Sequence, residues 1–176
     1  MEHHFHKAVA KEIENKLSGH GKLIKDSACG GNQRISLYAK EKKGLDTRMC
    51  DVDLIIEIKR KVKVIIEIEE SGFIPTKICG KFLQSAIAKY YIYGPRPETK
   101  VPYDDHVSFI QVLDGSKCLP KGTKKKEQAR IIEQEIRELL PLNGSNINCY
   151  HLNFVESENY REDLKNVCAI VLENLK

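Results

Sequence analysis

The chain of 176 residues is long enough for one domain with a hydrophobic core, and its 41% hydrophobic and 31% charged residues exclude a disordered protein. No apolar stretch approaches the ~20 residues of a membrane span. The net charge is only +4, but the lysines are clustered, which favours contact with phosphates. Histidines stand where a signal peptide needs apolar residues, so we expect one cytoplasmic domain over residues 1–176.

The first part of the chain is predicted to begin with a helix. Apolar residues recur at every fourth position from Phe5 to Leu17, which indicates an amphipathic helix over residues 3–17. The histidines at its start, His3, His4 and His6, could bind a metal, but we expect them to form a frayed and solvated terminus. After the helix we expect, in order, a loop, a strand and a polar turn: 25–33, 34–39 and 40–48.

An acidic β-hairpin is predicted next. Residues 52–58 and 62–68 alternate as β-strands do, and each run carries its acids on one face. The two acidic faces lie on the same side of the hairpin only if the turn contains an odd number of residues. We expect a three-residue loop at 59–61 without a bulge, because a two-residue loop would separate the acids. This loop would place Asp53 opposite Glu67, in an acidic patch that a divalent cation would stabilise.

The remaining elements are predicted to alternate between helices and strands. Pro75 suits the first turn of a helix that runs to about Ile92 and carries Lys77 and Lys81 on a polar stripe. This stripe is either a solvated face or, beside the acids, a source of phosphate or water ligands. We then expect a proline-rich loop, a strand, a helix, a strand and a helix: 94–105, 106–113, 124–140, 147–154 and 158–175. These elements predict an α/β fold whose mixed central sheet is flanked by helices on both faces.

Lysines gather before the helix predicted at residues 124–140. Lysines at a helix N-terminus oppose the helix dipole, whereas a bound phosphate would reverse that penalty and use the free N–H groups. A solvated basic turn is the alternative interpretation. The candidate nucleic-acid contacts are the basic turn at 59–63 and five lysines: Lys77, Lys121, Lys124, Lys125 and Lys126.

The predicted order of elements resembles the αβββαβ core of the PD-(D/E)xK nuclease superfamily, which includes restriction endonucleases, junction resolvases and repair nucleases. The signature of that superfamily is an acid at the start of the second strand and an acid-x-lysine at the end of the third. Asp53-Leu-Ile-Ile resembles the first element, and Glu67-Ile-Glu69 resembles the second. Two positions differ from the pattern, since Val52 precedes Asp53 in place of proline and Glu69 takes the place of lysine.

The resemblance implies a set of catalytic residues. Asp53 and Glu67 would bind Mg²⁺, for which Mn²⁺ could substitute, and a glutamate of the first helix, Glu14 or Glu12, would complete the metal ligands. Glu69 would bind the metal or accept a proton from the attacking water. In some members of the superfamily the lysine has moved to the next helix, which makes Lys81, with Lys77 as the other candidate, a transition-state contact.

The resemblance also implies a function. We expect a metal-dependent DNA endonuclease, a phosphodiester hydrolase that is a type II restriction endonuclease and acts as a homodimer. A junction-resolving or repair nuclease of the same fold is one alternative, and a catalytically inactive nucleic-acid-binding module is another. Asp51 and Glu57 share the acidic face but match no position of the superfamily pattern, so they are left out of the expected site.

Overall fold

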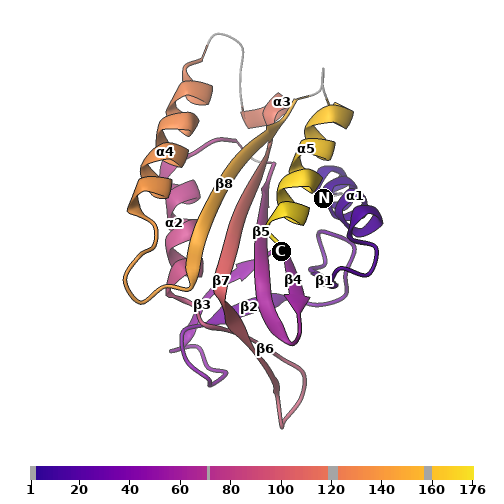
Figure 1. The fold of residues 1–176 in the computed structure, drawn as a ribbon, viewed down its shortest axis with the longest axis vertical. Coiled ribbons are helices and arrows are strands. Elements are labelled where there is room, and N and C mark those ends of the chain that lie inside the picture. Colours follow the sequence, from indigo (N-terminus) through magenta and orange to yellow (C-terminus); the bar gives the residue numbers. More distant parts are fainter. Residues whose placement is uncertain (1–2, 71, 119–122, 157–159) are drawn as a thin grey trace.

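A computed structural model describes residues 3–70, 72–118, 123–156 and 160–176. The centre of the fold is β7 (Thr99–Asp114), a strand of 16 residues that belongs to two parts of one mixed sheet (Figure 1). Its C-terminal part pairs in parallel with β5 (Lys61–Glu69) on one side and with β8 (Ile147–Val155) on the other. Beyond β5 the sheet continues with β4 (Leu54–Ile58) and β1 (Lys22–Lys25), each antiparallel to its neighbour.

The N-terminal part of β7 pairs with a second group of strands. Its neighbour there is β6 (Tyr90–Tyr93), which is antiparallel to it, and β2 (Ile35–Tyr38) and β3 (Arg48–Val52) follow. Since β3 leads directly into β4, the chain passes from one part of the sheet to the other at Asp53. This passage places Asp53 at a bend between two strands.

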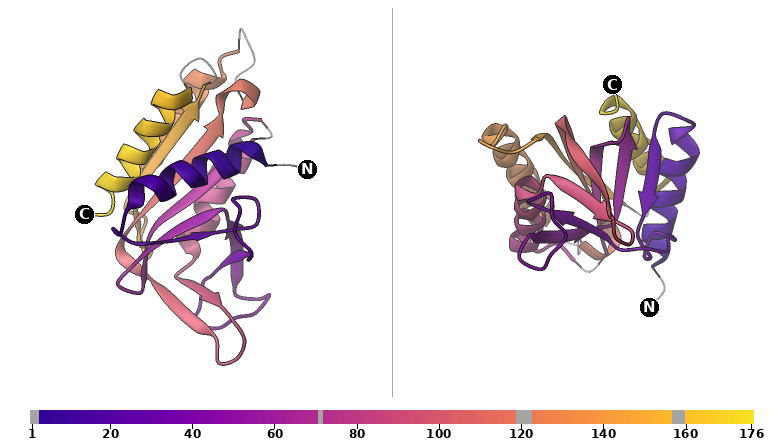
Figure 2. Two further views of the ribbon diagram at one scale, coloured as in Figure 1. Left: turned by 90° about the vertical axis from the view of Figure 1, so that its right-hand side faces the viewer. Right: turned by 90° about the horizontal axis from the view of Figure 1, so that it is seen from below.

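Helices cover both faces of the sheet, as the sequence predicts (Figure 2). One hydrophobic core lies under α1 (His4–Leu17) and α5 (Tyr160–Glu173), and the other lies under α2 (Pro75–Ile87) and α4 (Lys125–Leu139). The short α3 (Gly115–Cys118) follows β7 directly. Among the described residues, no helix has both the length and the apolar character that a membrane crossing requires.

The hairpin of β4 and β5 reaches the predicted register by a different route. The turn has two residues, Lys59 and Arg60, with φ values of 49° and 63°, so the prediction of a three-residue loop without a bulge is wrong. A bulge inserts Lys63 between the pair Glu57–Val62 and the pair Ile56–Val64. Since the extra residue in the strand replaces the extra residue in the turn, Leu54 lies opposite Ile66, and the same register places Asp53 opposite Glu67.

Two predictions about secondary structure are wrong, and one short strand, β1, has no counterpart among the predictions. The second helix ends at Ile87, because the tyrosine-rich residues after it favour a strand and form β6. Most of the predicted proline-rich loop belongs to β7, where Pro102 lies opposite Tyr90. The strand without a counterpart is Lys22–Lys25, which is too short to show a clear alternation in the sequence.

The order α-β-β-β-α-β is present in the fold, but its members differ from those expected. The three consecutive antiparallel strands are β1, β4 and β5, after which α2 leads to β7, parallel to β5. The strand predicted at residues 34–39 corresponds to β2, which pairs with β3 instead of lying beside β4. The pair β2–β3 is therefore an insertion between the first and second strands of this core.

Candidate active site

Glu67, which is buried, and Asp53, whose side chain is 16% exposed, form a pair of carboxyl groups at the α2 face of the sheet. Glu67 lies on β5, two residues after Ile65, which belongs to the core under α2. Glu67 is only 6% exposed. Asp53 Oδ2 accepts a hydrogen bond of 2.7 Å from the backbone N–H of Ile68, the residue after Glu67. This bond ties the bend between β3 and β4 to the end of β5.

Both carboxyl groups favour their protonated forms more than free carboxyls do. Burial is the largest cause for each: it raises the pKa of Glu67, where the charge of Asp53 adds to the effect, and it also raises the pKa of Asp53. The N–H of Ile68 and the neighbouring His6 oppose the shift at Asp53. The two carboxyl groups hydrogen-bond to each other, so one proton can be shared between them.

Lys81 brings a positive charge to this pair from α2. Its Nζ lies 3.1 Å from Oε1 and 3.3 Å from Oε2 of Glu67, and it donates a further bond of 3.2 Å to the backbone carbonyl of Asp51. Burial alone would lower the pKa of Lys81, but the charge and hydrogen bond of Glu67 outweigh it and raise that pKa. Lys81 therefore keeps its charge in a partly buried position.

A second pair of charges lies beside the first. Glu69 is two residues after Glu67 and lies on the same side of β5, while Lys77 is one helical turn before Lys81 on α2; the two side chains form an ion pair. The side chain of Glu69 is 15% exposed and that of Lys77 is 41% exposed. The lysines of α2 thus match the acids of β5 in a ladder of two pairs.

Glu70 connects the end of β5 to the start of α1. Its Oε1 accepts hydrogen bonds of 3.0 Å and 3.3 Å from the backbone N–H groups of Phe5 and His6, so it caps the first turn of the helix. Burial disfavours the charge of Glu70, but His6 and Lys117 outweigh that effect and lower its pKa. An anchored carboxylate of this kind fixes the helix N-terminus against the edge of the sheet.

His6 reaches the site from the opposite face of the sheet. Its Nδ1 lies 3.2 Å from Glu70 Oε1, its Nε2 lies 3.9 Å from Asp53 Oδ2, and the residue is only 8% exposed. The predicted solvated terminus is therefore wrong for His6. The sequence carried a signal for this burial, because His6 continues the apolar stripe of Ala10, Ile13 and Leu17 at helical spacing.

A cavity of about 350 Å³ joins these groups at the end of β5. It contains all four of the residues predicted to be catalytic, Asp53, Glu67, Glu69 and Lys81. Lys77, His6 and Lys117 also line it. Since a water molecule occupies about 30 Å³ in the liquid, this volume is sufficient for a hydrated cation and a phosphate group. The hairpin register and α2 together bring the central predicted residues into one place.

The predicted first-helix ligand is not part of this cavity. Both carboxylate oxygens of Glu14 accept bonds of 2.9 Å from Lys25 Nζ, on the α1 side of the sheet. Glu12 instead lines a groove between α1 and α5. The acids of the hairpin point toward α2, whereas α1 packs on the other face, so only its N-terminal turn can approach them.

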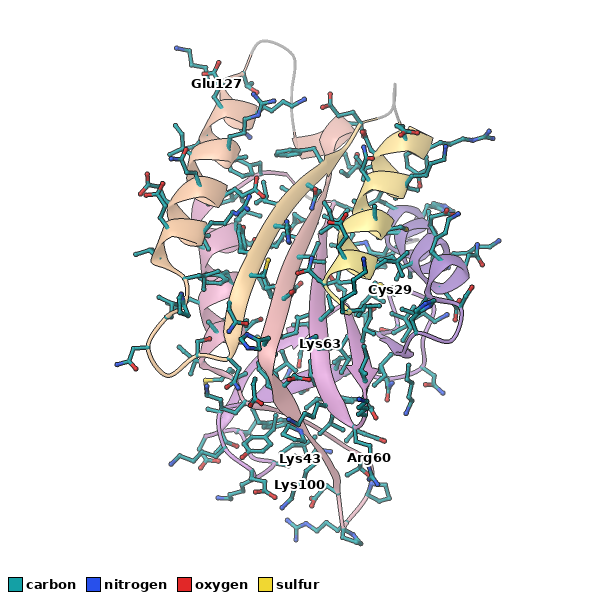
Figure 3. The ribbon with its side chains drawn as sticks, viewed as in Figure 1. Cys29, Lys43, Arg60, Lys63, Lys100 and Glu127 are labelled. Carbon is teal, nitrogen blue, oxygen red and sulfur yellow. The ribbon has the colours of Figure 1, made fainter. Side chains whose placement is uncertain are left out.

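The predicted nucleic-acid contacts lie at different distances from the site. Lys77 lines the cavity, whereas Lys124 and Lys125 border a separate hollow at the start of α4, and Lys126 pairs with Glu156. Figure 3 shows Arg60 and Glu127 at opposite ends of the molecule, so the basic hairpin turn is remote from the start of α4. Lys121 lies outside the described residues.

Two sets of side chains in the described part of the chain offer metal-binding atoms near this cavity. Asp53 and Glu67 supply carboxylate oxygens, which suit Mg²⁺ and Mn²⁺. His3, His6 and Glu70 form the second set, with ligand atoms within 4.8 Å of one another. In this second set Glu70 is already engaged as the cap of α1, so a structural role accounts for it.

Comparison of the chain with models of protein families gives no match, and comparisons with curated proteins and with solved structures give none either.

Proposed function

We propose that the protein is a metal-dependent DNA endonuclease with a site of the PD-(D/E)xK type. One observation carries the proposal: the buried carboxyl group of Glu67 and the partly buried carboxyl group of Asp53 share a cavity with the ammonium group of Lys81. A divalent cation bound by both carboxylates would replace their shared proton and offset the repulsion between them. The oxygen donors fit Mg²⁺ or Mn²⁺, and the nearby imidazole of His6 would favour Mn²⁺.

Each side chain has a role in phosphodiester hydrolysis under this proposal. When bound, the cation would polarise the scissile phosphate and lower the pKa of a water ligand. Asp53 and Glu67 would hold it, while Lys81 would offset the negative charge that develops on the phosphate. Lys81 thereby replaces the strand lysine that the superfamily pattern expects at Glu69. Glu69 is held by Lys77, which leaves it a supporting role at the cavity wall.

The proposal includes DNA as the substrate and a cytoplasmic location. Lys117 and Lys77 at the cavity would contact phosphates near the scissile bond. Lys124 and Lys125 would contact the backbone farther along, because the start of α4 lies at the same end of the sheet as the C-terminus of β5 (Figure 1). Such contacts are independent of sequence and weaken with salt.

A cleavage assay tests the activity. Plasmid and branched oligonucleotides are incubated with the protein and Mn²⁺ or Mg²⁺, with and without a chelator. We expect cleavage that the chelator abolishes and that Glu67→Gln reduces by at least about a hundredfold. Glu14→Gln is the matched control, since Glu14 is an acid outside the cavity, and it should keep full activity. Cleavage that survives both the chelator and Glu67→Gln would contradict the proposal.

Three more specific functions, which share this site, predict different results in the same assay. A type II restriction endonuclease, acting as a homodimer, would cut closed plasmid at a fixed sequence and leave both strands broken. A junction-resolving or repair nuclease would prefer the branched substrates. An inactive binding module would retain DNA with a steep salt dependence and no turnover on either substrate.

A further inference from the structure

A second cavity, of about 450 Å³, adjoins the candidate active site. Glu70 and Lys117 line both cavities, so they form the wall between the two. The second cavity extends from this wall to the ends of β7 and β8 and the starts of α1 and α5. Crevices at the carboxyl ends of parallel strands are common places for ligands, and this volume lies within the range of small-molecule sites.

The charged groups of the second cavity disfavour an anion. Asp114 and Glu70 contribute two carboxylates, and Lys117 contributes one ammonium group that lies 3.6 Å from Asp114 and 3.9 Å from Glu70. A phosphate placed deep in this cavity would meet two like charges. Asp114 Oδ1 already accepts bonds from the backbone N–H and the hydroxyl of Ser116, so Oδ2, 3.6 Å from Lys117, is the oxygen suited to accept a hydrogen bond from an amino or imino group.

The other walls of the cavity are apolar or aromatic. Phe5 and Ala8 come from α1, Val155 ends β8, and Tyr160 begins α5. Tyr160 packs partly against the core under α1 and α5 and lines the cavity together with Asp114. Burial, followed by the charge of Asp114, raises the pKa of its phenol. An aromatic ring beside a carboxylate is a combination that binds nucleobases, by stacking on the base and by accepting a bond from its exocyclic amine.

We propose that this cavity holds one unpaired nucleobase of the DNA strand that is cut, with Tyr160 as the stacking residue and Asp114 as the acceptor. The phosphate next to that base would lie over Lys117, at the wall between the cavities, which directs the adjoining phosphodiester toward Asp53 and Glu67. This inference rests on the proposed endonuclease function and specifies its substrate as DNA with an unpaired nucleotide beside the scissile bond. A paired base would first have to leave the duplex, at a cost in binding.

The test compares two labelled oligonucleotides of the same sequence, one fully paired and one forked at the cleavage position, in Mn²⁺. We expect wild-type protein to cut the fork at least about tenfold faster, and Tyr160→Ala to slow cutting of the fork by about tenfold and so to remove most of this preference. Tyr160→Phe keeps the ring and should behave as wild type. Arg161→Ala, an exposed neighbour on α5, is the matched control. A thermal melt checks that each variant is folded.

A binding measurement makes the result independent of turnover. The forked oligonucleotide carries 2-aminopurine as its unpaired base, and Ca²⁺ replaces Mn²⁺. Stacking on Tyr160 should quench the 2-aminopurine fluorescence, and Tyr160→Ala should lose most of the quenching. An abasic nucleotide at the same position should weaken binding by about tenfold.

The possible outcomes separate the two proposals. Chelator-sensitive cleavage with no preference for the fork would overturn the base pocket and leave the endonuclease. Quenching that depends on Tyr160, without cleavage, would support the pocket and overturn the activity. Failure to bind either oligonucleotide would overturn both. Saturable binding of free nucleosides, with no influence of strand structure, would overturn the base pocket in favour of a small-molecule site.

Discussion

Lys81 of α2 donates to both carboxylate oxygens of Glu67 on β5, at 3.1 Å and 3.3 Å, while Lys77, one turn earlier, pairs with Glu69. The two lysines therefore occupy equivalent positions on one helix and have similar exposure, 34% and 41%, but they differ in partner, since Lys81 contacts Glu67 and Lys77 contacts Glu69. This arrangement makes Lys77 an internal control for Lys81.

The first prediction concerns these two lysines. Lys81→Ala should reduce the rate constant of DNA cleavage by about 10²–10³, because it removes a fixed positive charge from the reacting phosphate. Lys77→Ala should reduce it by less than about tenfold, since its charge serves Glu69 and DNA binding. Single-turnover kinetics with saturating protein measures both variants. Equal losses for the two would show that the α2 lysines act only through the overall charge of the cavity.

The second prediction concerns metal binding without DNA. Adding Mn²⁺ at about 100 times its dissociation constant should stabilise the wild-type protein by about 2.7 kcal/mol. Asp53→Asn should lose most of this gain, because one of two carboxylate ligands is gone. Glu14→Gln should keep it, since Glu14 is bonded to Lys25 outside the cavity. Denaturant unfolding with and without the ion measures the difference. If Glu14→Gln lost the stabilisation by Mn²⁺, Glu14 would be a metal ligand after all.

The third prediction follows from the raised pKa of Glu67. A carboxyl whose pKa is higher in the folded than in the unfolded state binds its proton more tightly when folded. The metal-free protein should therefore lose stability as the pH rises above the ordinary value of 4.5 toward neutrality. Glu67→Gln should flatten this dependence and raise the melting temperature at about pH 7.5. Urea unfolding across this range, in chelator, provides the measurement.

Opposite behaviour would overturn that prediction. If Glu67→Gln lowered stability at every pH, the ion pair with Lys81 would outweigh the burial of the carboxylate. The titration of Lys81 does not interfere in this range, because its raised pKa lies above 10.5, and the stability gained from its pairing is lost only as the pH rises through that value.

The fourth prediction concerns the hairpin turn. Lys59 and Arg60 both have positive φ, a conformation that asparagine and glycine adopt more readily. The double change Lys59→Asn and Arg60→Gly should raise the free energy of unfolding by about 1 kcal/mol. Since the turn is at the opposite end of β5 from Glu67, cleavage should be unchanged. The midpoint and slope of urea unfolding, with the cleavage rate, test both statements.

The acidic pair could be predicted from the sequence because strand alternation reports the side of a residue. The two acids lie on one side of the hairpin whenever an odd number of residues separates them along the chain. The sequence did not reveal that Lys63 in a bulge, instead of a third turn residue, supplies the odd number, since bulge and turn give the same parity. The register of Asp53 and Glu67 therefore agreed with the prediction although the turn did not.

Other parts of the site depend on packing, which periodicity does not describe. Helical spacing identified the buried face of α1 but not the face of the sheet that it would cover. The superfamily resemblance supplied a first-helix glutamate, Glu14 or Glu12, and nothing in the sequence showed that α1 covers the face away from the acids. His6 lies on the buried stripe, but its position in the first turn predicted fraying. The hydrogen bonds that Glu70 accepts from this turn hold it in place. The hydrogen bond from the His6 N–H to Glu70 joins residues 64 positions apart, so it depends on tertiary structure and not on local periodicity.

The anchoring of α1 by Glu70 has a practical consequence for purification. An affinity tag attached before residue 3 would be joined only three residues from His6, beside the groups proposed to bind the ion. A polyhistidine sequence there would compete for that ion and could imitate or mask metal dependence in every assay. The start of α1 and the end of the chain after α5 lie apart in both views of Figure 2, so a tag placed after Lys176 avoids this interference.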